Sequence, residues 1–128
     1  MSESALIRKY VLVIEDDSSI RESISIVLDF LKLDSHSVSD GAAALDYLDT
    51  AKFLPALILL DLSMPVMDGE SFRRRQLEKP ELCSIPTVLL SAKPHVEELA
   101  TSLGISKILI KPFLFEDLVN TLKAFSAL

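Results

Sequence analysis

The chain has 128 residues, a formal net charge of -6 and a sequence pI of about 4.8. A chain of this length suits one domain with a single hydrophobic core. Hydrophobic residues make up 49% of it, which is ordinary for a globular protein. A nucleic-acid surface requires a basic stripe, so the acidic balance predicts no direct nucleic-acid partner.

No segment has the features of a membrane span or a signal peptide. The longest apolar stretch, residues 54–60, is too short to cross a bilayer and contains Pro55. Residues 1–4 begin acidic and lead directly into an apolar segment. We therefore expect no membrane insertion and, by default, a cytoplasmic location. Cys83 is the single cysteine, which excludes a disulfide framework and a thiolate metal cluster.

Short, nearly continuous apolar segments alternate with amphipathic segments along the chain. The apolar segments are residues 10–14, 56–60, 87–90 and 107–110, with a weaker candidate at 35–39. Such segments are typical of strands buried on both faces of a parallel sheet. Between them, apolar residues recur at helical spacing in four stripes: Ile20, Ile24, Val27, Leu28 and Leu31; Ala44, Leu45 and Leu48; Val96, Leu99, Ala100 and Leu103; Leu118, Leu122 and Phe125.

Helix boundary signals agree with this division. Ser18 or Ser19 is predicted to cap the first helix, and Gly41 to break the chain before the second. Gly69 is the break that allows the third helix to start, and Gly104 ends the fourth.

The predicted third helix contains three consecutive arginines, Arg73, Arg74 and Arg75. We expect them to form a solvated helix face. Glu70 lies one turn before Arg74, so the two side chains are expected to form a weak ion pair.

Five strands alternating with five helices predict an α/β fold, an open doubly wound five-stranded parallel sheet. The expected strand order is the flavodoxin-like 2-1-3-4-5, with ligands bound beyond the carboxyl ends of the strands. Residues 1–128 are expected to form this one domain, with no output domain following in the chain.

Four of the apolar segments end in polar residues that would meet at one sheet edge. Asp61 ends the run at 56–60, acidic residues 15–17 follow the first run, and Ser91 and Lys111 follow the last two. A buried carboxylate is costly unless it is compensated. Clustered acidic oxygens without histidine or thiol suit Mg²⁺, and a carboxylate can act as a nucleophile. A phosphoryl group on Asp61 would share its charge with the metal, Lys111 and Ser91.

Each of these residues also has a simpler explanation. The acidic residues 15–17 could be a solvated cluster favoured by a helix dipole, Asp61 could start an Asx turn, Lys111 could be a strand exit, and Ser91 could be a cap. Four independent caps would seldom fall at one sheet edge with complementary charges, which favours a single site.

Four segments resemble the receiver domains of two-component response regulators over essentially the whole chain. They are residues 11–21 (VLVIEDDSSIR), 58–69 (ILLDLSMPVMDG), 87–92 (TVLLSA) and 108–113 (ILIKPF). The resemblance implies a phosphoacceptor signalling domain, not an enzyme acting on a separate substrate, that catalyses its own phosphorylation and dephosphorylation. Its partners would be a sensor histidine kinase or phosphotransfer protein and a downstream effector protein.

The resemblance also assigns roles in phosphoryl transfer. Asp61 would be the phosphoacceptor, and Lys111 would pair with it and with the phosphoryl group. Ser91 would supply the hydroxyl that turns inward on phosphorylation. Ser63 and Lys93, two residues beyond Asp61 and Ser91, would border the site and tune phosphoryl lifetime.

The same resemblance implies a Mg²⁺ site. Asp16 and Asp61 would ligate the metal directly, Glu15 would act through water, and the backbone carbonyl of Ser63 would complete the protein's ligands. Asp17 falls in the variable place after the acidic pair, where a capping or surface role is expected.

Phosphorylation would shift an equilibrium between two conformations and change the surface of the fourth helix, fifth strand and fifth helix, where a homodimer could form. Ile108 stands where many receivers have an aromatic switch residue, so coupling is expected to use smaller motions or a different route. Three alternatives stay open: a degenerate receiver acting as a phosphorylation-independent docking module, an aspartyl phosphatase or phosphotransferase, and a flavin or nucleotide module. Ser63 in place of a second acid disfavours the phosphatase, and the absence of a glycine-rich loop disfavours the nucleotide module.

Overall fold

The computed structural model describes residues 9–128, so residues 1–4, considered above for a signal peptide, lie outside the described part. Over residues 9–128 the strands are β1 (Tyr10–Ile14), β2 (Asp34–Val38), β3 (Leu57–Asp61), β4 (Thr87–Ser91) and β5 (Ile108–Ile110). The helices are α1 (Ser18–Phe30), α2 (Gly41–Thr50), α3 (Gly69–Leu77), α4 (Glu97–Ser102) and α5 (Phe115–Ala124). None of these helices is long and apolar enough to cross a membrane.

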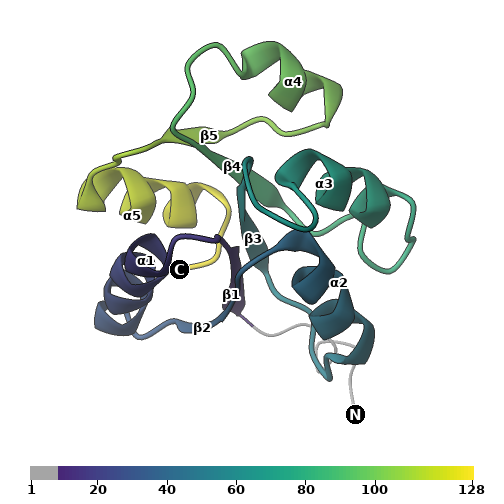
Figure 1. The fold of residues 1–128 in the computed structure, drawn as a ribbon. Coiled ribbons are helices and arrows are strands. Elements are labelled where there is room, and N and C mark those ends of the chain that lie inside the picture. The colour runs from purple at the N-terminus through teal and green to yellow at the C-terminus, as the bar shows by residue number, and fades with distance from the viewer. Residues whose placement is uncertain (1–8) are drawn as a thin grey trace.

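All neighbouring strands pair in parallel, in the order β2-β1-β3-β4-β5 (Figure 1). Each strand is followed by a helix, which brings the chain back to the amino-terminal side of the sheet before the next strand begins. The predicted doubly wound α/β fold and its strand order are therefore confirmed. Parallel pairing also places the carboxyl ends of all five strands at one edge.

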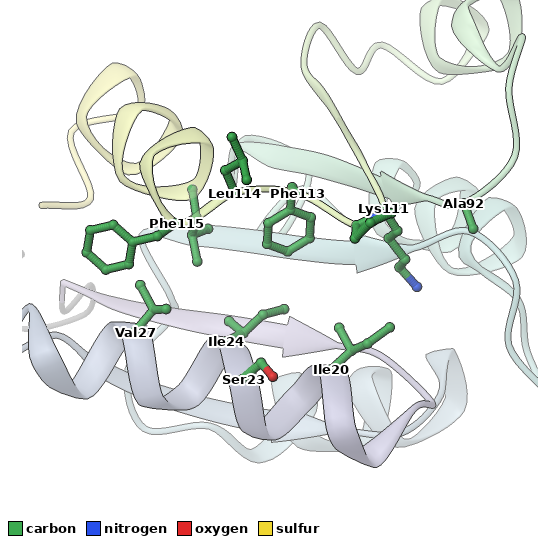
Figure 2. Close-up of a pocket in the computed structure, with 11 residues that line it drawn as sticks. Ile20, Ser23, Ile24, Val27, Ala92, Lys111, Phe113, Leu114 and Phe115 are labelled. Carbon is green, nitrogen blue, oxygen red and sulfur yellow. The ribbon is translucent and has the colours of Figure 1, made fainter.

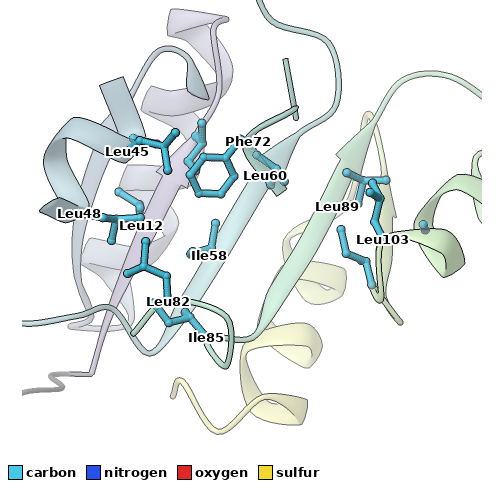
Figure 3. Close-up of a cluster of buried hydrophobic side chains, with 14 of the residues drawn as sticks. Leu12, Leu45, Leu48, Ile58, Leu60, Phe72, Leu82, Ile85, Leu89 and Leu103 are labelled. Carbon is cyan, nitrogen blue, oxygen red and sulfur yellow. The ribbon is translucent and has the colours of Figure 1, made fainter. Parts of the chain in front are cut away.

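The sheet is buried on both faces, because helices cover each of them. In Figure 1, α1 and α5 lie on one face and α2 and α3 on the other. Along β1, Leu12 and Ile14 belong to the core beside α2 and α3, whereas Val11 and Val13 belong to the core beside α1 and α5. The first of these cores, which includes Phe72, is shown in Figure 3. This two-sided burial explains why the central strands are continuously apolar.

Strand β2 is the exception, since its sequence, Asp34-Ser35-His36-Ser37-Val38, is mostly polar. It is the outermost strand on one side of the sheet and is largely exposed. A polar edge strand discourages pairing with another chain. Its edge position accounts for the weak apolar signal in this part of the sequence.

The prediction that Ser18 or Ser19 caps α1 is wrong, because Asp17 is the capping residue. Its carboxylate accepts hydrogen bonds from the backbone N–H groups of Ser19 and Ile20 at 2.9 and 3.1 Å. An aspartate at this place satisfies free N–H groups and opposes the positive end of the helix dipole. The capping role expected for Asp17 is confirmed.

Two further boundaries refine the predictions. Gly41 is the first residue of α2 and does not break the chain before it, because Asp40 is the cap and accepts from Ala43 N at 2.8 Å. Gly104 follows the end of α4 with a φ of +69°, a backbone conformation that favours glycine, as predicted.

The prediction of a solvated face for all three arginines is wrong for Arg73. Its side chain is buried with Phe72 and Gln76 on the sheet side of α3, with 6% exposure. Arg74 points outward and forms the predicted ion pair with Glu70 at 2.9 Å. The difference follows from helical phase, since successive residues are about 100° apart around the axis.

Arg73 connects three parts of the fold through hydrogen bonds. It donates to the carbonyl oxygens of Leu103 (2.9 Å) and Gly104 (3.3 Å) at the end of α4, and to Gln76 Oε1 (2.9 Å) and Thr87 Oγ1 (3.1 Å). Burial lowers the pKa of this guanidinium below its ordinary value. Carbonyl groups at a helix end lack partners within the helix and carry partial negative charge, so they suit a buried cation.

Replacing Arg73 with alanine should lower the free energy of unfolding by about 3 kcal/mol, because several buried acceptors lose their donor. Arg74→Ala is the matched control and should cost less than about 1 kcal/mol, since its ion pair is exposed. Urea denaturation measures both values. Equal losses in the two variants would contradict the role given to the Arg73 hydrogen bonds.

Candidate functional site

Two carboxylates meet at the carboxyl edge of the sheet because of strand register. Ile14 at the end of β1 pairs with Leu60 of β3, so the next residues, Glu15 and Asp61, lie side by side. Both are buried, with 0% and 3% exposure. Asp16 follows Glu15 and is exposed. Carboxylate oxygens of Glu15, Asp16 and Asp61 all lie within 4.8 Å of one another.

Lys111 reaches this acidic cluster from the end of β5. Its ammonium nitrogen, Nζ, lies 2.6 Å from Glu15 Oε1 and 3.0 Å from Asp61 Oδ1. Although β5 is two strands away from β3, the lysine stem spans the distance. The structure therefore brings together Glu15, Asp16, Asp61 and Lys111 at the edge where the sequence placed them.

The electrostatics of the cluster are unbalanced. Burial, together with the neighbouring carboxylates of Glu15 and Asp16, raises the pKa of Asp61 to about 7, although the Lys111 ammonium opposes the shift. Burial alone would lower the pKa of Lys111, but its hydrogen bonds with Glu15 and Asp61 raise it above the ordinary value. Three carboxylates thus outnumber the two positive groups nearby, the Lys111 ammonium and the Arg21 guanidinium, which leaves an excess of negative charge.

The donor set fits a hard divalent cation. The cluster consists of carboxylate oxygens and contains neither histidine nor thiol, and Mg²⁺ prefers one or two carboxylates together with water or phosphate oxygens. A cation would also offset the repulsion that raises the pKa of Asp61.

Ser63 lies in the turn after Asp61, and its backbone N–H is 3.4 Å from Asp61 Oδ1.

Ser91 lies at the same sheet edge, but its hydroxyl is engaged with the next loop. Asp61 pairs in register with Leu90, which puts Ser91 one residue farther along β4. The Ser91 hydroxyl donates to the carbonyl oxygen of Lys93 at 3.1 Å and accepts from its N–H at 3.0 Å. To donate to a group bound to Asp61, this hydroxyl would have to give up its bond to the Lys93 carbonyl oxygen.

Gly69 holds the turn after Asp61 close to the strand. Its N–H donates to the carbonyl oxygen of Leu62 at 3.0 Å. A Cβ atom at this position would collide with the carbonyl oxygen of Asp61 and crowd the Cα of Leu62. Gly69 is the first residue of α3 and Asp68 is its cap, so, like Gly41, it does not break the chain before the helix. Close approach to the backbone of Asp61 is the reason that a glycine fits here.

Arg21 is a site residue that the sequence reasoning did not assign. Its Nη1 atom donates to the backbone carbonyl oxygens of Glu15 at 2.8 Å and Asp16 at 3.0 Å. A usable signal was present, because Arg21 stands one helical turn after the cap Asp17. Long side chains on a helix point back toward its N-terminus, here toward the acidic loop.

An apolar groove of about 520 Å³ adjoins the site between α1 and the start of α5. Figure 2 shows Ile20 and Ile24 of α1 facing Phe113 across it. The stem of Lys111 lines one end, and its ammonium group extends beyond the groove. The charged cluster is therefore bordered by exposed apolar surface.

Comparison with known proteins places this geometry in one family. Residues 11–123 match the family model described as the response regulator receiver domain. The chain is 37% identical over 108 residues to the sensor histidine kinase TmoS of Ectopseudomonas mendocina, covering 80% of this chain and 10% of TmoS. It spans about half the length of the response-regulator relatives that it matches.

Solved structures agree with the fold. Chemotaxis response regulator CheY4 of Vibrio cholerae has a TM-score of 0.82 and 29% identity, with 91% of this chain and 97% of CheY4 covered. The receiver domain of sensor histidine kinase PA1611 from Pseudomonas aeruginosa PAO1 has a TM-score of 0.80 and 25% identity, with coverage of 91% and 95%. That structure has a magnesium ion coordinated in its active-site cleft.

The strand order, the acidic cluster at the carboxyl edge and the family match together show that this chain belongs to the response regulator receiver domains of two-component signalling.

Proposed function

We propose that this domain accepts a phosphoryl group on Asp61 from a phosphohistidine, in a Mg²⁺-dependent step. The observation that carries the proposal is the convergence of Glu15, Asp16 and Lys111 on the Asp61 carboxylate. Phosphoryl transfer needs chiefly positioning and charge neutralisation, and these side chains offer both.

In the proposed step, a carboxylate oxygen of Asp61 attacks phosphorus, the phosphorus–nitrogen bond of the donor breaks, and the released imidazole takes up a proton. Asp16 and Asp61 would hold Mg²⁺ directly, Glu15 through water, with the Ser63 carbonyl as a further ligand. The metal would supply positive charge to the phosphoryl oxygens. The domain would also catalyse its own dephosphorylation, in which water hydrolyses the phosphoryl group on Asp61.

Lys111 would change partners during this reaction. Before transfer its ammonium is paired with Glu15 and Asp61. Once Asp61 carries a phosphoryl group, the ammonium can pair with a phosphoryl oxygen without a large movement. The Ser91 hydroxyl would exchange its bond to the Lys93 carbonyl oxygen for a bond to the same group, which links phosphorylation to the loop before α4.

The proposed output is a shift between two conformations of the surface formed by α4, β5 and α5. Ile108 of β5 is half-buried and packs against the core beside α2 and α3, to which Ala100 of α4 also belongs. It lacks the ring of an aromatic switch residue, so we infer coupling through smaller motions of β5 and the loop after Ser91. The changed surface would bind a downstream effector or form a homodimer.

The proposed donor is a sensor histidine kinase or phosphotransfer protein in the cytoplasm. To place its phosphohistidine at Asp61, such a protein must cover the surface around Lys111. The apolar groove between α1 and α5 begins at that lysine (Figure 2). Its position supports docking of the donor there, because the groove is continuous with the site.

Incubation with Mg²⁺ and a small phosphodonor should add one phosphoryl group, measured by intact mass. Asp61→Asn should abolish the adduct because it removes the nucleophile. Asp68→Asn is the matched control, since Asp68 is an exposed helix cap and asparagine also caps well. Absence of an adduct on the wild-type protein with any donor would favour a phosphorylation-independent docking module.

Asp16→Ala should weaken Mg²⁺ binding by at least about tenfold, because it removes a proposed direct ligand. Isothermal titration calorimetry measures the affinity. Asp17→Asn is the control and should leave the affinity nearly unchanged, since asparagine keeps the α1 cap. If Asp17→Asn weakened binding and Asp16→Ala did not, the assignment of the acidic pair would be off by one residue.

Without metal, the contribution of Asp61 to the free energy of unfolding should fall as pH rises from about 4 to about 7. Asp61 keeps its proton up to about pH 7 in the folded protein, whereas an unfolded aspartic acid loses it near pH 4, so deprotonation favours unfolding in this window. Asp61→Asn should flatten the profile and raise stability at pH 8 by about 2 kcal/mol. Chemical denaturation across pH tests this, and an Asp61→Asn profile as steep as that of the wild type would disprove it.

A further inference from the structure

Arg21 joins the first helix to the acidic loop of the candidate site. We propose that Arg21 is a positioning residue that holds Glu15 and Asp16 in the arrangement required for binding a divalent cation. The proposal rests on the Mg²⁺ site of the proposed function. It assigns to Arg21 no contact with the cation itself.

The contacts of Arg21 are aimed at the backbone of both acidic residues. One guanidinium nitrogen, Nη1, bonds the carbonyl oxygens of Glu15 (2.8 Å) and Asp16 (3.0 Å). Two bonds to successive carbonyl groups fix the direction of the peptide unit between them. The directions in which the Cα–Cβ bonds of Glu15 and Asp16 leave the backbone are thereby restrained as well.

Glu15 and Asp16 depend on this anchor to different degrees. Glu15 is buried, its N–H donates to the carbonyl oxygen of Val38 at 3.1 Å, and its carboxylate pairs with Lys111. Asp16 is exposed and lies in the short connection between β1 and α1. Asp16 is therefore the ligand whose position should depend most on Arg21.

The support for Arg21 is rigid. The backbone N–H of Arg21 donates to the carbonyl oxygen of Asp17 at 3.0 Å, within the first turn of α1. The helix is held against the sheet by the buried side chains of Ile24 and Leu28. A guanidinium mounted on a packed helix loses less freedom when it binds the loop than one on a flexible segment.

The charge and the geometry of Arg21 have opposite effects on cation binding. A positive side chain near the site repels Mg²⁺, so its removal should tighten binding if charge alone matters. Loss of the two backbone bonds should weaken binding, because the ligands then sample other orientations. The sign of the change in affinity therefore separates the two roles.

Calorimetric titration of Mg²⁺ into metal-free wild type and Arg21→Gln, at fixed ionic strength, tests the proposal. We expect Arg21→Gln to weaken binding by roughly tenfold, as removal of contacts that orient metal ligands commonly does. The Mg²⁺ affinity of Arg21→Lys should lie between those of the wild type and Arg21→Gln, because an ammonium keeps the charge but does not reproduce the planar guanidinium. The rise in unfolding temperature produced by Mg²⁺ should decrease in the same order.

Lys32→Gln is the matched control, since it removes one positive charge about 16 Å away along the helix direction, just past the end of α1. It should leave the affinity nearly unchanged. If the wild type bound Mg²⁺ and Arg21→Gln bound it equally well or more tightly, the positioning role of Arg21 would be overturned and the proposed function would stand. Absence of Mg²⁺ binding by wild type would instead overturn the proposed function on which this role rests.

Discussion

The arrangement of the site depends on the side-by-side placement of two buried carboxylates, Glu15 and Asp61, on adjacent parallel strands. Register makes this unavoidable once Ile14 pairs with Leu60. Two negative charges out of water cannot be stable without compensation. Lys111 provides one positive charge from β5, and its ammonium contacts both carboxylates.

The same constraint explains the structure around the site. Strands β1, β3 and β4 are buried on both faces, so their positions are fixed by packing and not by the polar ends that they carry. Gly69 allows the turn after β3 to return against the backbone of Asp61. Arg21 holds the loop after β1 from the helix side. Side chains that repel one another are thus kept together by a scaffold whose stability comes from elsewhere.

The fold and the location of the site could be predicted from the sequence, because both depend on local patterns. Continuous apolar runs mark strands buried on two faces, and a polar residue at the end of each run marks the shared edge. Three features could not be predicted in this way. The burial of Arg73 depends on helical phase and on carbonyl acceptors about thirty residues away in the chain, at Leu103. The cap of α1 depends on which of several neighbouring polar residues begins the helix, and the orientation of the Ser91 hydroxyl depends on Lys93 in the following loop.

Two buried charged groups in this domain are handled in different ways. Arg73 is surrounded by neutral acceptors, and the carbonyl groups at the end of α4 offset its charge without a carboxylate. Each of its three nitrogens donates at least one hydrogen bond, as expected for a group that joins structural elements. The cluster at Asp61 is different, because its three carboxylates outnumber the two positive groups nearby and the pKa of Asp61 is raised to about 7. A polar cluster whose charges balance stabilises the fold. One that keeps an excess charge at an accessible edge is suited to bind an ion from outside and to change when a charged group is added.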